Sequence, residues 1–297
     1  MFAPSFWEKI KADDMRPPGE HSLDLLIEEL EHMLRSPEEQ IRDGFALEIL
    51  GDWILAGYCD HDLEDLGDRL CAALFRGLGE RGTDTVFGRT FAALVLGLCV
   101  ERDNTARLLT DEAVQRWLGA FLMWWELEAD LRGIVDPAKG VAHAVAHGAD
   151  VIASVARSRY LARSQAQVLL GSIVVRLRTS DSGALLFGED DRLAYATMSL
   201  LHRGDLGVAD LRQAIVPLAH LGRTEQRFDL APSAYSRLNA LNWLRAVYLQ
   251  LRLGVHPMPW VSDGSHFSRP VPEREQMLLL LEDTLRYYSY WFADAHR

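Results

Sequence analysis

Two histidines and an aspartate lie close together near the middle of this 297-residue chain, in the run His143-Ala-Val-Ala-His147-Gly-Ala-Asp150. If the run is helical, the three side chains fall within about 60° of one another around the helix axis. Histidines four residues apart can bind one metal ion, with Asp150 as a third ligand or as a group that orients an imidazole. The spacing is therefore compatible with a site for a divalent metal such as zinc.

Charged residues just before this run widen the candidate site to include Glu128, Asp130, Arg132 and Lys139. One use is a metal site, and another is a general base made by His147 with Asp150 or Glu128. The third is a structural network in which the histidines bond carboxylates and Arg132 pairs with Glu128 or Asp150. The pattern favours this network over a ligand site, and a ligand site over metal catalysis.

Arg89 is a further candidate, because it stands near the start of a strongly apolar helical segment. A charged residue in that position is expected to reach a carboxylate on a neighbouring helix rather than to remain unpaired in the core. We therefore expect Arg89 to form a structural ion pair.

These residues are positioned by helices, since apolar residues recur at three- and four-residue steps along nearly the whole chain. The pattern predicts helices over 23–34, 41–56, 62–78, 86–100, 113–127, 141–156, 165–177, 192–201, 208–221, 238–253 and 275–292. Most of them pair into hairpins of irregular length. We predict an all-α fold of stacked antiparallel helical hairpins, a HEAT-like α-solenoid with about five hairpins plus an N-terminal helix. An irregular compact helical domain is the alternative.

The chain is expected to form a single domain over 1–297, with an N-terminal arm at 1–21 and a long inserted loop at 254–272. The loop carries His256, Trp260, Asp263 and His266. Long loops in compact proteins are often functional, so it is interpreted either as a lid or partner contact or as an ordered crossover whose tryptophan fills the end of the core. The aromatic residues 287–292 are expected to cap the last repeat.

Composition limits the classes of function. The net charge of −12 repels a phosphate backbone and disfavours a nucleic-acid partner. Three cysteines without a C-x-x-C pair predict buried thiols in a reducing cytoplasm. The start of the chain does not resemble a signal peptide, and the apolar run 91–100 is too short to span a bilayer. We expect an acidic cytoplasmic protein without a membrane segment.

No motif identifies a cofactor. The stretch Gly77-Leu-Gly79-Glu-Arg-Gly82 matches the spacing of a dinucleotide-binding loop, but it follows a predicted helix where that motif needs a strand. H-E-x-x-H, G-x-S-x-G and Walker A patterns are absent from the sequence. No cofactor is therefore predicted beyond the divalent metal considered above.

The chain resembles a bacterial family catalogued as domain of unknown function 2785. The resemblance rests on Glu128-x-Asp130-x-Arg132-Gly133 and on the run from Lys139 to Asp150, with support from short pieces at 41–43, 89–94 and 242–251. It spans roughly residues 40 to 252. Members tend to have a tryptophan where this chain has Val141, which alters packing and removes no candidate ligand. The resemblance implies a helical fold and a candidate surface, without a mechanism.

These observations favour a binding or scaffold module that uses the surface around the His-x3-His-x2-Asp helix for a protein or small-molecule partner. The alternative is a metal-dependent hydrolase with His143 and His147 as ligands and Glu128 or Asp130 as base or further ligand. The sequence does not indicate the substrate, the biological process or the oligomeric state.

Overall fold

A computed structural model describes residues 2–178, 183–223, 232–261 and 264–288 of the chain. Consecutive helices pack against one another in an all-α helical-repeat fold, and the strands are confined, in these ranges, to one short hairpin. None of the described helices is both long enough and apolar enough to cross a membrane. The chain divides into two compact units, unit 1 at Met1–Tyr160 and unit 2 at Leu161–Arg297.

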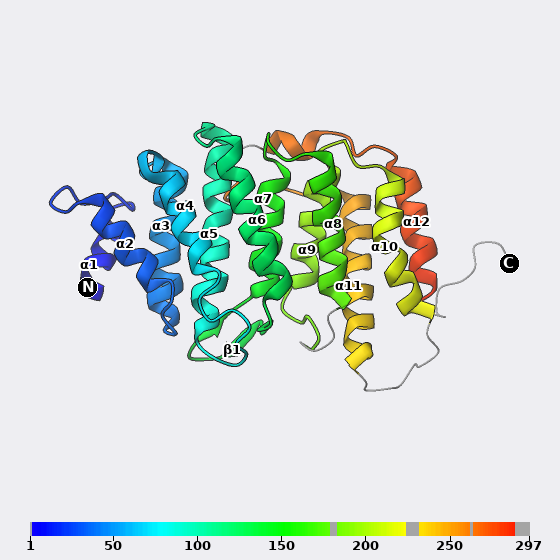
Figure 1. The fold of residues 1–297 in the computed structure, drawn as a ribbon, viewed down its shortest axis with the longest axis horizontal. Coiled ribbons are helices and arrows are strands. Elements are labelled where there is room, and N and C mark those ends of the chain that lie inside the picture. The colour runs from blue at the N-terminus through cyan, green and yellow to red at the C-terminus, as the bar shows by residue number, and fades with distance from the viewer. Residues whose placement is uncertain (1, 179–182, 224–231, 262–263, 289–297) are drawn as a thin grey trace. The chain divides into compact units, whose positions relative to one another are not determined.

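Unit 1 contains most of the elements that matter for the candidate site (Figure 1). In chain order they are α1 (Pro4–Ala12), α2 (Leu23–Met33), the π-helix η1 (Gln40–Leu47), α3 (Glu48–Ala56), the short η2 (Asp60–Asp62), α4 (Leu63–Ala73), α5 (Thr85–Ala106), α6 (Asp111–Leu127), β1 (Ile134–Asp136), β2 (Gly140–Val141) and α7 (Ala144–Ala156). The predicted helix over 41–56 is thus present, but its first half is a π-helix.

Helix α5 lies at the centre of unit 1, where it contacts α3, α4 and α7. Its apolar residues, among them Phe91, Val95 and Cys99, are buried, because neighbours on several sides leave little of the helix facing water. The approach of α7 is close at Gly97, where an added Cβ would lie 3.5 Å from the Cα of Val151. Helix α5 therefore supplies a rigid frame for any side chain that it carries.

The hairpin β1–β2 replaces the first turn of the helix that was predicted over 141–156. Gly140 has a φ of +69° and His143 a φ of +50°, and the helix begins only at Ala144. The backbone N–H groups of Ala142 and His143 instead donate to the carbonyls of Gly133 and Arg132. The left-handed backbone of His143, inside the predicted range, is incompatible with a continuous helix, so the prediction was wrong over residues 141–143.

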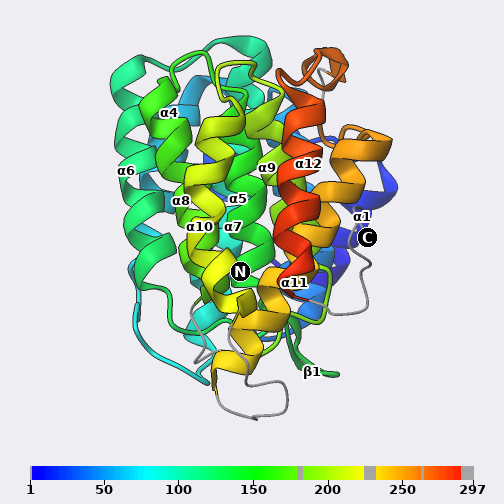
Figure 2. The same ribbon diagram turned by 90° about the vertical axis from the view of Figure 1, so that its right-hand side faces the viewer.

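Unit 2 contains α8 (Arg163–Arg178), α9 (Glu189–Leu201), α10 (Val208–Arg223), α11 (Pro232–Leu253), the short η4 (Gly264–Ser268) and α12 (Arg274–Arg286). Helix α11 packs on α8, α9 and α12, while α10 packs on α8 and α12. Figure 2 shows α8 and α10 side by side as one layer of this unit, with α9 and α11 in the other. The single domain predicted from the sequence remains a prediction, since two compact units can belong to one repeat array or to separate domains.

Described residues of both irregular segments predicted from the sequence make contacts with the rest of their unit. The 1–21 arm contains α1, whose Trp7 and Ile10 are buried. In the 254–272 loop, His266 is buried with Nε2 2.8 Å from the carbonyl of Ser199, and Arg192 lies over the half-buried ring of Trp260. These contacts favour an ordered crossover over a lid, while Asp263 lies outside the described residues.

Candidate functional site

Arg89 and Glu128 form a buried ion pair between α5 and the end of α6. Arg89 Nε donates to Glu128 Oε2 at 2.6 Å and Nη2 donates to Oε1 at 3.1 Å, with side-chain exposures of 0% and 1%. The Trp124 indole and the Asp130 backbone N–H also donate to this carboxylate. Burial of both charges is tolerable because the charges neutralise each other and both carboxylate oxygens accept hydrogen bonds. The predicted structural ion pair of Arg89 is confirmed.

The remaining nitrogen of Arg89 ties down the loop between α4 and α5. Nη1 donates to the carbonyls of Arg76 and Gly77, at 3.1 and 2.8 Å, and to the Thr85 hydroxyl at 3.0 Å. The guanidinium thus joins three segments of unit 1, namely the loop after α4, the first turn of α5 and the end of α6. Its contacts hold this end of the unit in one conformation and leave Arg89 without access to solvent.

Asp130 pairs with Arg132, two residues further along. Arg132 Nε and Nη2 donate to Asp130 Oδ1 and Oδ2 at 2.8 and 2.7 Å, and the Gly82 N–H donates to Oδ2 at 2.8 Å. Burial alone would raise the pKa of Asp130, but the hydrogen bonds from Arg132 and Gly82 outweigh it and hold the pKa below the ordinary value. The partners predicted for Arg132 were Glu128 or Asp150. The structure instead pairs Arg132 with Asp130, which also accepts from the Arg132 backbone N–H, while Glu128 is engaged by Arg89.

Lys139 joins the hairpin to the start of α5. Its Nζ donates to both carboxylate oxygens of Asp84, at 2.7 and 2.8 Å, while Asp84 stands at the N-cap position of α5. The backbone carbonyl of Lys139 accepts from Arg42 Nη2 at 2.8 Å. The hairpin is therefore fixed on two sides, to α5 by its side chain and to η1 by its backbone.

Only two of the three residues in the His-His-Asp run lie within a helix, although the two histidine rings are neighbours with centroids 6.0 Å apart. His143 precedes α7 in a left-handed conformation, whereas His147 and Asp150 lie within the helix. His147 Nδ1 is 3.2 Å from the Thr90 carbonyl of α5, and its ring meets Phe91 edge-on with centroids 4.9 Å apart. His147 and Asp150 are 6% and 5% exposed. These two residues thus belong to the interior of unit 1 rather than to an open surface.

The metal site that the sequence suggests at His143, His147 and Asp150 stays a prediction. Among the residues that the structure describes, no group of three or more histidine, cysteine, aspartate or glutamate side chains is arranged to hold a metal ion. His143 stands at the N-cap of α7 and not within the helix, and its ring centroid lies 6.0 Å from that of His147. The hydrolase alternative, which needs His143 and His147 as ligands, gains no support from this geometry.

Arg42 is a buried charged residue that the sequence reasoning did not single out. It lies in η1, donates from Nη1 to the Ser36 carbonyl at 3.0 Å, and stacks over the Phe87 ring at 4.1 Å. Burial lowers the pKa of its guanidinium, against the opposing charge of Asp43. A signal was present in the sequence, since Arg42 occupies the same helical stripe as the apolar residues at 45, 49 and 53.

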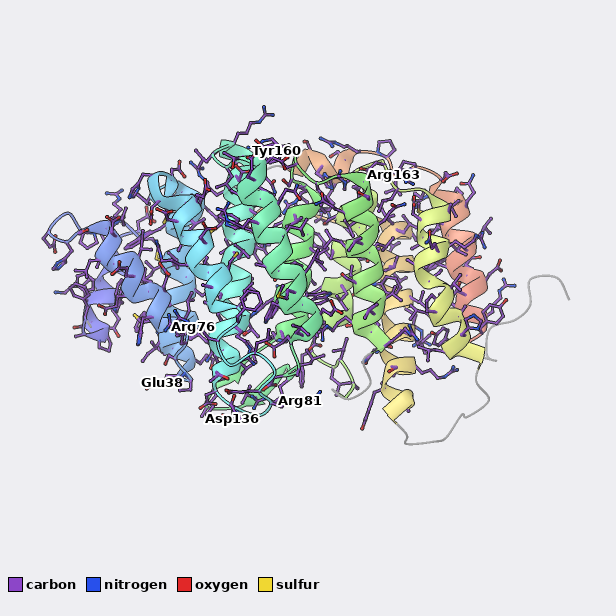
Figure 3. The ribbon with its side chains drawn as sticks, viewed as in Figure 1. Glu38, Arg76, Arg81, Asp136, Tyr160 and Arg163 are labelled. Carbon is purple, nitrogen blue, oxygen red and sulfur yellow. The ribbon has the colours of Figure 1, made fainter. Side chains whose placement is uncertain are left out.

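An open hollow lies beside this network. Its volume is about 420 Å³, and its lining includes Arg35, Arg76, Gly77, Glu80, Asp84 and Thr85. Figure 3 places Arg76 at the end of unit 1 that also carries Glu38, Arg81 and Asp136, away from Tyr160 at the opposite end. Because Gly77 and Thr85 accept hydrogen bonds from Arg89, the buried pair directly supports the wall of the hollow. The sequence did not reveal this hollow, since its lining comes from three separate segments.

Comparison with known proteins identifies one family. The model of a family described as Protein of unknown function (DUF2785) matches residues 74–249, more than half of the chain. This range contains all eight candidate residues from Arg89 to Asp150, together with Arg76 in the hollow. No curated protein and no solved structure matches the chain. The family predicted from the Glu128–Arg132 and Lys139–Asp150 runs is therefore confirmed, and the chain belongs to the DUF2785 family.

Proposed function

We propose that this protein is a helical-repeat binding module whose binding surface is the hollow at the hairpin end of unit 1. The observation that carries the proposal is the support of this hollow by the buried Arg89–Glu128 pair, which reaches its wall at Gly77 and Thr85. A preformed cavity of about 420 Å³ is in the size range of sites for small molecules. The partner is accordingly a small molecule or the protruding group of a larger one.

The candidate residues of the sequence act as scaffold in this proposal. Glu128, Asp130, Arg132 and Lys139 each contact another segment through hydrogen bonds of 2.6–3.1 Å, and several of them are buried. Rigid support of this kind lowers the entropic cost of binding, because the loop needs no further ordering when a ligand enters. The binding surface thus lies beside the predicted residues and depends on them.

The proposal includes a HEAT-like arrangement of the hairpins and a cytoplasmic location. Stacked hairpins commonly present a continuous surface for partners. The three cysteines are free and buried, which fits a reducing compartment.

The test is amide NMR of the full-length protein against a library of small metabolites, with the blocking variant Ala73→Trp. Ala73 lines the hollow at the end of α4, and an indole there fills the space. The control is Ala72→Trp, which lies on the same helix, is exposed and is not part of the lining. Ligands should perturb amides around residues 76–88 and lose at least about tenfold in affinity in Ala73→Trp alone. Ligands that perturb other regions, or equal affinities in the two variants, would contradict the proposal.

A further inference from the structure

Two arginines face the same hollow, and neither side chain is paired. Arg35 follows α2 and Arg76 follows α4, and both side chains are exposed. Among the described residues, neither makes a side-chain hydrogen bond or a salt bridge. In the same unit, Arg69, Arg89 and Arg132 each bind a carboxylate. The two lining arginines thus differ from the neighbouring ones in having their donors available.

The two positive charges are close enough to affect each other. Burial lowers the pKa of Arg35 first and the charge of Arg76 lowers it further, while the charge of Glu31, a carboxylate that forms its salt bridge with Arg69, raises it. The stem of Arg35 lies along Gly88 of α5, where a Cβ would come within 3.1 Å of Arg35 Cγ. Two like charges held near each other are stabilised by an anion between them.

The acidic residues of the hollow are committed to other partners. Both oxygens of Asp84 accept from Lys139, so this charge is balanced by a neighbouring amine. Glu80 Oε2 accepts from the hydroxyls of Thr83 and Thr85 at 2.9 and 2.8 Å. Neither carboxylate forms a salt bridge with Arg35 or Arg76 in the described structure, so the guanidinium groups keep their capacity to bind an external anion.

The first turn of α5 also places positive charge beside the hollow, although less than the two arginines do. Asp84, Thr85 and Gly88 line the hollow, and Asp84 makes no side-chain capping hydrogen bond to the 22-residue helix. The N-terminus of a helix carries partial positive charge from its backbone N–H groups. This effect supports the two arginines and would not by itself define a site.

We propose that the hollow binds a phosphate monoester of a small metabolite, with the phosphate group held by Arg35 and Arg76. This inference rests on the proposed function and names the ligand class for the same hollow. A guanidinium binds two oxygens of a phosphate with parallel hydrogen bonds, and two guanidinium groups can engage three or more oxygens. A carboxylate has only two. The volume of about 420 Å³ leaves room for the organic part of the ligand beside the phosphate.

The test measures binding of inorganic phosphate and of glycerol 3-phosphate to the full-length protein in phosphate-free buffer, by amide NMR. Both should shift the amides of Gly77, Thr85 and Gly88 in a saturable way, and the ester should bind more tightly. Arg35→Gln and Arg76→Gln should each weaken binding about tenfold or more, because a hydrogen bond to a charged group is lost. Arg212→Gln, an exposed arginine of unit 2, is the control and should change nothing.

The outcomes separate this inference from the proposed function. The phosphate assignment is overturned if no saturable shifts appear, or if Arg212→Gln loses as much phosphate affinity as Arg35→Gln and Arg76→Gln do. If uncharged ligands shift the same three amides while phosphates do not, the hollow binds ligands but the anion class is wrong. If no ligand shifts them, both proposals fail. Binding of a phosphorylated peptide without binding of the small ester would overturn the assignment to a metabolite.

Discussion

Charged side chains inside unit 1 are held in pairs, and the pairs connect distant segments. Arg89 and Glu128 are almost fully buried, and Asp130 is buried against Arg132. Taking a charge out of water costs several kcal/mol, so a buried charge without its partner is strongly destabilising. The residues that first suggested chemistry therefore have a demonstrable physical role in stability, which can be measured one pair at a time.

We expect Arg89→Met to lower the free energy of unfolding by about 3–5 kcal/mol, because it leaves the Glu128 carboxylate buried beside an apolar side chain. The double variant Arg89→Met/Glu128→Met should lose less than the sum of the two single changes. Urea denaturation followed by circular dichroism measures each value.

Arg116→Met is the control for this pair, because Arg116 holds Glu64 and Asp68 at the surface. Arg116→Met should lower the free energy of unfolding much less than Arg89→Met does, since exposed ion pairs contribute little to stability. Additive losses in the Arg89/Glu128 cycle would show that the two side chains do not act as a pair.

Asp130 should make stability depend on pH in a defined window. Its folded-state pKa lies below the ordinary value of 3.8, so its contribution is present above that pH and is lost as the pH falls through the lower, folded pKa. At pH 7 we expect Asp130→Asn to destabilise the protein by about 1–3 kcal/mol. The difference from the wild type should shrink below about pH 4.

Melting temperatures of the wild type and Asp130→Asn between pH 7 and pH 2.5 measure this dependence. Asp283→Asn, at an exposed position of α12, serves as a comparison whose offset from the wild type should not change with pH in this way. A constant offset for Asp130→Asn over the whole range would contradict the assigned shift.

At the scale of elements, the packing of a tryptophan of α6 against α7 depends on a glycine in α7. Gly148 of α7 faces Trp125 of α6, and a Cβ at Gly148 would lie 2.2 Å from Trp125 Cζ3. No atom can occupy that position unless the tryptophan or a helix moves. The glycine therefore sets the distance between the helix that carries His147 and the helix that leads to Glu128.

We expect Gly148→Ala to destabilise the protein by about 1–3 kcal/mol through this overlap. Gly119→Ala is the matched control, since Gly119 lies within α6 with no atom within 4 Å of an added Cβ. There alanine should stabilise the helix by about 0.5–1 kcal/mol, because it restricts the unfolded chain. Thermal unfolding measures the two expected changes, a loss of stability in Gly148→Ala and a gain in Gly119→Ala. A loss of the same size in both variants would refute the packing argument.

At the scale of the whole molecule, the reactivity of the three cysteines measures whether the core of unit 1 is closed to solvent. Cys59, Cys71 and Cys99 are buried there, and burial raises the pKa of Cys59 and Cys71 to about 12. A thiol that is both inaccessible and protonated does not react with a disulfide reagent. The thiols should therefore become reactive only when unit 1 opens.

We expect fewer than one thiol per chain to react with 5,5′-dithiobis(2-nitrobenzoate) in the native protein at pH 8, and all three in urea. The rate of reaction in intermediate urea should follow the loss of helical signal from unit 1. Fast labelling of the native protein would show that the core around Cys99 is open to solvent, contrary to its full burial.

The sequence by itself determined the helical class, the approximate bounds of most helices and the pairing of Arg89 with a carboxylate. These features are local or nearly so, because helical periodicity is encoded within a few residues and a buried arginine must have a partner wherever it lies. The family was also recognisable, since the motifs that carry it are continuous in the chain.

Tertiary structure alone decided which residues meet. The hairpin before α7 exists because Lys139 reaches Asp84 and its carbonyl meets Arg42, residues 55 and 97 positions away. At the end of this hairpin Gly140 and His143 adopt left-handed backbone, so that His143 stands at the N-cap of α7 and not within the helix that spacing alone predicted. The hollow of Arg35 and Arg76 likewise arises from separate segments. Pairings over such separations depend on how the helices pack, and no periodicity in the sequence specifies them.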